Sequence, residues 1–291
     1  MTTVDDVSVL DRLRALVAAG GVVVLSGAGI STESGIPDYR GPSGQLRARL
    51  PMTVREFTSS AEARRRYWAR SYVGWRRVAR ARPNAGHLAV GALQQQGAVA
   101  GIITQNVDGL HQAAGARGVI ELHGGLDHVV CLDCGARSPR AQLDEWLRAV
   151  NGELVTEIAQ VNPDGDVELA NVLVASFVLV GCECCGSDLL KPDVVFFGEN
   201  VPRARVTRCF ELVERASSLL VLGSSLTVMS GLRFVHRAAA GGIPIAIVNQ
   251  GITRGDEYAD VKLDRPLGET LTRLVNAPSP LDTLDQAQPE R

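Results

Sequence analysis

Four short apolar segments, each followed by a polar motif, constrain the fold of this 291-residue chain more than any other feature. The first, residues 21–26, is too short for a helix and rich in valine, which favours a buried strand of a parallel sheet. Similar segments occupy residues 99–103, 218–222 and 244–248. Because parallel strands end at one edge of a sheet, their polar motifs are expected to meet in one cleft. The pattern predicts an α/β fold with a Rossmann-like parallel sheet flanked by helices.

The motif after the first segment reads GAGISTESGIPDYRG over residues 27–41. Gly27 and Gly29 let the backbone approach a ligand closely, as in a turn that cradles a pyrophosphate. Thr32 replaces the third glycine of the dinucleotide fingerprint, so the glycines alone fit a plain strand-to-helix turn equally well. The polar, turn-rich residues that follow indicate a loop over a cofactor.

The second and third motifs supply polar side chains of different kinds. Gln105, Asn106 and Asp108 follow residues 99–103, where they could form a site or an Asx turn leading into a helix. Ser224 and Ser225 follow residues 218–222, and Thr227 breaks the Gly-x-Ser-x-Gly pattern of a hydrolase nucleophile. These serines are therefore interpreted as phosphate or ribose contacts.

His123 follows another short apolar segment, residues 119–122, and precedes two glycines. We expect a histidine at such a strand end to be exposed enough to titrate near neutrality, as a general base must. A single histidine is more often structural than catalytic. The other four histidines are interpreted as structural. His87, His128 and His236 lack adjacent chemistry, and His111 follows the second motif, whose loop residues are already interpreted as part of a site.

Two Cys-x-x-Cys-Gly knuckles predict a structural zinc site with four thiolate ligands: Cys131, Cys134, Cys182 and Cys185. Cys184 lies between two of them, and the spacing and following glycine favour Cys182 as the ligand. A helix is predicted over residues 139–150 with Ser138 as its cap, and a turn over residues 162–166.

The motifs, in this order, resemble those of the sirtuins, the NAD-dependent protein deacylases, over roughly residues 10–275. The resemblance implies that NAD is a co-substrate and that a modified lysine is deacylated to give nicotinamide and 2′-O-acyl-ADP-ribose. It implies His123 as the general base, with Asn106 and Asp108 orienting the ribose and nicotinamide. The implied cofactor contacts are Gly27, Ala28, Gly29, Ser31, Pro37, Asp38, Tyr39, Arg40, Gln105, Asn106, Asp108, Gly223, Ser224, Ser225, Asn249, Gln250, Gly251 and Leu267.

The substrate side is predicted from two further segments. Residues 190–199 form an extended run that could be a core strand or a free edge, and in sirtuins the matching segment pairs with the peptide backbone. The implied peptide contacts are Val195, Phe196, Gly198 and Glu199. Tyr67 and Arg70 share a helix face, and some sirtuins use such a Tyr-x-x-Arg pair to hold an acyl carboxylate, although pairs at this spacing are common.

Residues 43–82 are expected to form irregular helical segments, and their arginines either contact nucleic acid or an acidic peptide or, by base rate, form a solvated face. The insertion between the knuckles resembles that of class II sirtuins, whose deacetylation can be feeble beside removal of other acyl groups. Two lysines among 30 basic residues are typical of a GC-rich bacterial genome.

Composition narrows the partners and the location. A net charge of −2 gives no general attraction to nucleic acid or anionic membranes, and no apolar run approaches the ~20 residues of a membrane span. The first residues lack the basic and apolar regions of a signal peptide, so we expect a cytoplasmic protein. Acyl-lysine proteins or peptides are the expected partners.

The predicted domain organisation is discontinuous. The Rossmann-like domain takes three parts, a small domain combines a helical part with the zinc module, and a polar tail is expected to be disordered. The boundaries are 1–42, 83–126 and 191–276 for the first, 43–82 and 127–190 for the second, and 277–291 for the tail. Two other functions remain open: protein mono-ADP-ribosylation, and NAD sensing by a zinc-containing binding module without turnover.

Overall fold

The computed structural model describes residues 4–39, 52–153, 167 and 169–276. Its main feature is a six-stranded sheet in the order β3-β2-β1-β7-β8-β9, in which every pairing is parallel. The strands are β1 (Val22–Ser26), β2 (Val99–Thr104), β3 (Ile120–Glu121), β7 (Ser218–Leu222), β8 (Ile245–Val248) and β9 (Val261–Leu263). The predicted α/β fold is confirmed.

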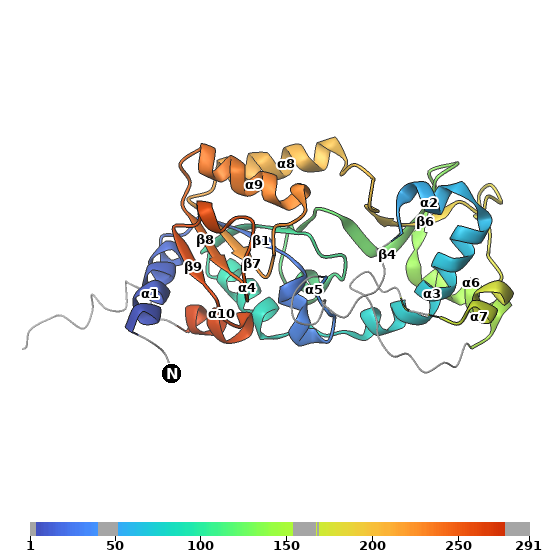
Figure 1. Ribbon diagram of the computed structural model, residues 1–291, viewed down its shortest axis with the longest axis horizontal. Coiled ribbons are helices and arrows are strands. Elements are labelled where there is room, and N and C mark those ends of the chain that lie inside the picture. Colours follow the sequence, from blue (N-terminus) through green and yellow to red (C-terminus); the bar gives the residue numbers. More distant parts are fainter. Residues whose placement is uncertain (1–3, 40–51, 154–166, 168, 277–291) are drawn as a thin grey trace, which may run out of the picture.

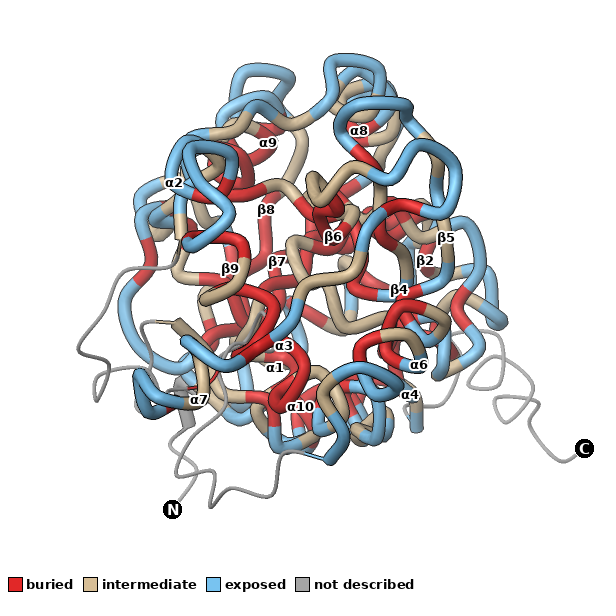
Figure 2. The backbone as a smooth tube through the Cα atoms, turned by 90° about the vertical axis from the view of Figure 1, so that its right-hand side faces the viewer, coloured by how far each residue is buried: buried red, intermediate tan, exposed pale blue. Residues whose placement is uncertain are grey.

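Helices cover both faces of this sheet, which explains why its strands are apolar without alternation. Val22 and Val24 pack in the core beneath α1 (Val4–Ala18), α4 (Ala85–Gln95) and α10 (Leu267–Val275). Val23 and Leu25 point to the opposite core, beneath α8 (Arg203–Glu214) and α9 (Met229–Ala240). Figure 2 shows the central strands as a buried layer inside exposed helix surfaces.

A second, smaller domain lies at the other end of the molecule in Figure 1. Its antiparallel sheet has the order β5-β4-β6. Its elements are α2 (Val54–Ser59), α3 (Ala61–Arg80), β4 (Gly124–Cys131), β5 (Arg137–Pro139), α6 (Arg140–Asn151), α7 (Asn171–Ser176) and β6 (Leu190–Val194). The two domains have separate apolar cores, and the small one is rich in aromatic side chains. Two of the predicted domain boundaries, after residues 126 and 190, fall inside β4 and β6. The exact domain boundaries therefore remain a prediction.

The arginine-rich segment differs from the expectation. It forms one regular 20-residue helix, α3, capped by Ser60. Arg64 and Arg70 are buried, and one guanidinium nitrogen of Arg64 lies 2.8 and 3.0 Å from the two carboxylate oxygens of Asp188. The solvated-face interpretation is therefore wrong for these arginines, because long side chains fixed by acidic partners can pack a helix onto its neighbours.

The starts of two helices differ in how they are capped. Asn84 caps α4, since its Oδ1 accepts from the backbone N–H of Gly86 and of His87. Ser138 does not cap α6: it lies in β5, and Pro139 occupies the N-cap position. A proline there replaces side-chain capping with a favourable backbone angle. The predicted turn at 162–166 and the tail 277–291 lie outside the described residues.

A buried histidine pair lies beneath the first two strand ends. The rings of His87 and His111 meet edge to face with centroids 5.0 Å apart, and Nε2 of His111 lies 2.8 Å from the Ser26 hydroxyl. Burial lowers the pKa of each ring to about 4, so both are neutral at physiological pH.

Over the described ranges, no helix combines the length and apolar composition that crossing a membrane requires.

Candidate functional site

A cavity of about 690 Å³ opens at the carboxyl edge of the parallel sheet, and residues of the small domain complete its wall. All four strand-end motifs line it, as expected for a parallel sheet. Of the predicted cofactor and catalytic residues, those in the lining are Gly27, Ala28, Gly29, Ser31, Asp38, Tyr39, Gln105, Asn106, Asp108, His123, Gly223, Ser224, Ser225, Asn249, Gln250 and Gly251.

Two predicted cofactor residues lie outside this lining, and a third is not described. Pro37 and Leu267 are not among the described residues that line the cavity, and Arg40 lies outside the described residues. Leu267 instead supports the lining from below, since a Cβ on Gly223 would come within 2.8 Å of its Cδ1. It begins α10, where apolar burial rather than ligand contact explains its type.

The glycines of the first motif have a second use besides approach to a ligand. Gly29 donates its N–H to the Gly223 carbonyl over 2.8 Å, and a Cβ on Gly29 would lie 2.8 Å from that oxygen. A Cβ on Gly27 would lie 2.8 Å from the Cβ of Ser224. The first and third motifs therefore pack backbone against backbone, and only glycine allows that distance. The first motif continues as η1 (Ala28–Ser34), a short 3₁₀ helix rather than a plain loop.

Ser31, Asn106 and Asp108 form one hydrogen-bonded group in the cavity wall. Ser31 donates to Oδ2 of Asp108 over 2.7 Å, and Nδ2 of Asn106 donates to the Ser31 hydroxyl over 3.0 Å. Oδ1 of Asp108 accepts from the N–H of Leu110 at the start of α5 (Leu110–Ala113). The Asx-turn interpretation is therefore confirmed, since one carboxylate oxygen accepts from the backbone two residues on. The other oxygen joins the polar group in the cavity wall, and the role of this group in a site stays a prediction.

His123 is held through both ring nitrogens. Nδ1 lies 2.9 Å from the Gln105 carbonyl, which can only accept, so Nδ1 carries the hydrogen. Nε2 is then the acceptor and lies 2.7 Å from the Ser230 hydroxyl. The ring is only partly exposed where it lines the cavity, and its burial lowers its pKa below 6.5, aided by the charges of Arg205 and Arg233. His123 is therefore a neutral imidazole at neutral pH.

Sequence reasoning missed the contribution of α9. Its first residues, Met229, Ser230 and Arg233, line the cavity. Their local sequence lacks a chemical motif, and the contact of Ser230 with His123 joins residues 107 positions apart. The available signal was the helical spacing of apolar residues from Leu232 to Ala238, which places the helix start beside the third motif.

The segment after β6 forms the wall on the small-domain side. Val195 donates its N–H to the His123 carbonyl over 2.7 Å, so this segment is bonded directly to the histidine backbone. β6 pairs only with β4 among the described strands, which makes it an edge strand rather than a core one. The predicted peptide residues Val195, Phe196, Gly198 and Glu199 all line the cavity.

An ion pair between a buried lysine and a partly exposed glutamate fixes the shape of this segment. Nζ of Lys191 lies 2.9 Å from Oε2 of Glu199, and the same oxygen accepts from the N–H of Phe196 over 2.9 Å. Lys191 is 3% exposed, donates to the Val194 carbonyl and lies 4.7 Å from the centre of the Phe196 ring. The lysine therefore holds both ends of the turn over residues 194–199.

The two residues of the predicted acyl clamp differ in their contact with the cavity. Tyr67 lines the cavity, whereas Arg70 is not among the described lining residues and is buried within the small domain. A one-turn spacing puts the two side chains on adjacent parts of a helix face, but α3 is buried over most of its surface, so neighbouring positions meet different surroundings. Around Tyr67 the lining is mostly apolar, with Ile36, Met52 and Phe196.

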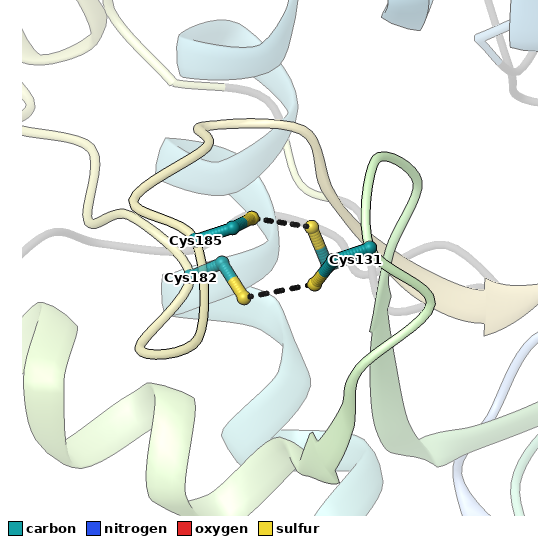
Figure 3. A group of neighbouring side chains, drawn as sticks. Cys131, Cys182 and Cys185 are labelled. Atoms are coloured by element: carbon teal, nitrogen blue, oxygen red, sulfur yellow. Dashed lines mark hydrogen bonds between the residues drawn. The ribbon is translucent and has the colours of Figure 1, made fainter.

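The four predicted zinc ligands form one cluster on the small domain (Figure 3), with all four sulfurs within 4.8 Å of one another. Sγ of Cys131 lies 3.6 Å from that of Cys185, and Sγ of Cys134 lies 3.7 Å from that of Cys182. Four thiolates about 2.3 Å from a tetrahedral Zn²⁺ would be about 3.8 Å apart, so the group fits zinc. Cys184 is exposed and outside the cluster, as predicted.

Comparison with known proteins places the chain in one family. The family model described as the Sir2 family matches residues 27–230. "NAD-dependent protein deacetylase 1" of Streptomyces coelicolor is 59% identical over 274 residues, covering 94% of this chain and 90% of that protein. A protein of the same name from Mycobacterium avium is 50% identical over 277 residues, covering 94% and 96%.

Solved structures agree with the sequence comparisons. A Sir2 structure with a p53 peptide and NAD⁺ aligns with a TM-score of 0.72 at 31% identity, covering 91% of this chain and 96% of that one. Another, with a deacetylated p53 peptide and 3′-O-acetyl-ADP-ribose, aligns with a TM-score of 0.74 at 30% identity, covering 91% and 96%. With its fold, its cavity and its four-cysteine cluster, the chain belongs to the Sir2 family.

Proposed function

We propose that this protein is an NAD-dependent protein-lysine deacetylase that releases nicotinamide and transfers the acyl group to ADP-ribose. The observation that carries the proposal is the neutral His123, whose Nε2 faces a cavity lined by all four strand-end motifs. The relatives named as NAD-dependent deacetylases support it, as do related structures with NAD⁺ and with acetyl-ADP-ribose. A cytoplasmic location stays a prediction.

The lining residues are assigned to different parts of NAD by their position in the cavity. We assign the diphosphate to the backbone of residues 27–29 and 223–225, and the adenine ribose to residues 249–251. We further propose that Asn106 and Asp108 orient the nicotinamide and its ribose, and that Asp38 and Arg40, the latter outside the described residues, close the loop over them. His123 accepts the proton of a ribose hydroxyl and so makes that oxygen the nucleophile toward the acyl carbon.

The peptide lies against residues 195–199, beside the edge of β6, where it can add backbone hydrogen bonds. We infer a preference for neutral acyl groups over acidic ones, because apolar side chains surround Tyr67 and Arg70 is not in the lining. Membership of class II, with stronger activity on acyl groups other than acetyl, is proposed from the sequence of the insertion alone.

The test is nicotinamide release from NAD with peptides that carry acetyl, long-chain, succinyl, glutaryl or methylglutaryl lysine. We expect release with the neutral acyl peptides, roughly tenfold or more above the acidic ones, since an acidic group would lose hydration without gaining an ion pair. Preference for succinyl or glutaryl lysine would overturn the acyl inference. Bound NAD without release, or a peptide heavier by one ADP-ribose, would replace the deacetylase assignment with sensing or ADP-ribosyl transfer.

Replacing Lys191 by methionine should raise the KM for the acyl peptide about tenfold and change the KM for NAD little. The ion pair with Glu199 fixes only the peptide side of the cavity, and breaking it leaves a carboxylate unpaired beside Phe196. Lys191→Arg should recover most of the peptide affinity. Arg273→Met serves as the control, because it also breaks an ion pair, with Glu269, at a residue outside the cavity lining. Equal changes in both KM values would contradict the assignment.

A further inference from the structure

The hydroxyl of Ser230 occupies the one lone pair with which His123 can act as a base. Nδ1 of His123 carries the hydrogen that it donates to the Gln105 carbonyl, so the Nε2 lone pair accepts the Ser230 hydroxyl hydrogen over 2.7 Å. Ser230 is 9% exposed and lines the cavity in the first turn of α9. In this arrangement, the proton that His123 can accept at Nε2 is the one on the Ser230 hydroxyl.

The packing of α9 holds this serine in place. A Cβ on the next residue, Gly231, would come within 2.6 Å of Oε1 of Gln105, so the helix start rests directly on that side chain. The Gln105 amide is itself held, since its Nε2 donates to the Ser224 hydroxyl over 2.8 Å. Gln105 therefore orients one ring nitrogen of His123 through its carbonyl and fixes the partner of the other through its side chain.

We propose that Ser230 is a proton relay between the ribose hydroxyl and His123, an inference that rests on the deacetylase function proposed above. The ribose hydroxyl gives its proton to Oγ of Ser230 while the Ser230 proton moves to Nε2. Serine is regenerated, the imidazole becomes imidazolium, and the ribose oxygen keeps the electron pair that forms its bond to the acyl carbon. No oxidant or further reactant is needed.

A proton relay and a purely structural role of Ser230 predict different kinetic effects when the serine is replaced. The ribose hydroxyl reacts only after nicotinamide has left, so loss of the relay slows acyl transfer and spares the earlier, reversible step. That earlier step is measured separately, as exchange of labelled nicotinamide into NAD in the presence of an acetyl peptide. A residue that merely supported the cavity would change both rates together.

The experiment compares Ser230→Thr with Ser230→Val, which share one shape and differ by a hydroxyl, and adds Ser230→Ala. We expect deacylation to fall about 10²-fold in the Val and Ala variants, the lower range for proton-transfer catalysis, with nicotinamide exchange within about threefold of the parent. Thr should recover most of the lost deacylation. Ser59→Ala, which removes an exposed hydroxyl on α2, is the control for serine loss.

Equal deacylation by the Thr and Val variants would overturn the relay, and so would a parallel loss of exchange and deacylation in Val and Ala. The outcome for the deacetylase function is separate: it fails only where the unaltered protein neither exchanges nicotinamide nor deacylates the peptide. Unfolding of the Ala variant leaves the Thr and Val comparison as the deciding measurement.

Discussion

Replacing His123 by alanine should reduce deacylation by about 10²–10⁴-fold while zinc content and thermal unfolding stay as in the parent protein. The ring accepts the proton that makes a ribose oxygen nucleophilic, and no other described histidine lines the cavity. Its removal deletes two hydrogen bonds, to the Gln105 carbonyl and the Ser230 hydroxyl, but the backbone bond from Val195 to the His123 carbonyl remains. The fold should therefore survive.

The measurement is single-turnover deacylation of an acetyl peptide with saturating NAD. His236→Ala is the matched control, because His236 is exposed and stacks on Tyr258 away from this cavity. Deacylation by His123→Ala within tenfold of the parent would remove His123 from its role.

The pH dependence of the parent protein gives a second readout of the same residue. Burial stabilises the neutral imidazole and sets the pKa of His123 below 6.5. A base works in its neutral form, so the rate should hold as the pH falls through 6.5 and decline only below it. A loss of rate centred above that value would contradict the role of burial.

The parallel sheet could be predicted because its signals are local. Each of the four predicted strands is a short run rich in β-branched residues or leucine and is followed by a polar motif. A run such as Val22–Ser26 is too short for a helix and fits a strand buried on both faces. The four cysteines of the zinc cluster could also be predicted from the sequence, since each Cys-x-x-Cys turn brings its own two sulfurs together. In both cases a few consecutive residues carry the whole signal.

The remaining parts depend on contacts between distant residues. The burial of Arg64 follows from Asp188, 124 positions away, and the partner of His123 follows from where α9 begins. The ion pair of Lys191 and Glu199 closes a turn that reads in the sequence as an extended run. Charge and spacing along the chain do not fix such pairings, because tertiary packing decides which side chains lose water.

The zinc cluster is connected to the cavity by the contacts of α3. Asp188, three residues after Cys185, holds Arg64, and the indole N–H of Trp68 donates to the Leu190 carbonyl over 2.8 Å. Between Arg64 and Trp68 on the same helix lies Tyr67, which lines the cavity. The position of Tyr67 therefore depends on the shape of the second knuckle, although the metal takes no part in the chemistry.

Replacing Cys182 by serine should reduce bound zinc from one per chain to nearly none and lower the unfolding temperature by roughly 10 °C or more. Structural zinc contributes its binding free energy to folding, and a few kcal/mol lost from a chain of this size gives a shift of that order. Cys184→Ser is the matched control, since Cys184 is two residues away, exposed and outside the cluster. It should keep the zinc, the unfolding temperature and the activity of the parent.

The measurements are zinc content of the purified protein, thermal unfolding and deacylation of an acetyl peptide. Deacylation should fall with the zinc in the Cys182→Ser protein, since α3 loses the knuckle that holds Arg64 and Trp68. Chelation of the parent protein should reproduce the loss, and added Zn²⁺ should reverse it where the small domain refolds around the four thiolates. Full activity without zinc would show that the position of α3 does not depend on the metal. Loss of zinc in the Cys184→Ser protein would show that Cys184 is a ligand.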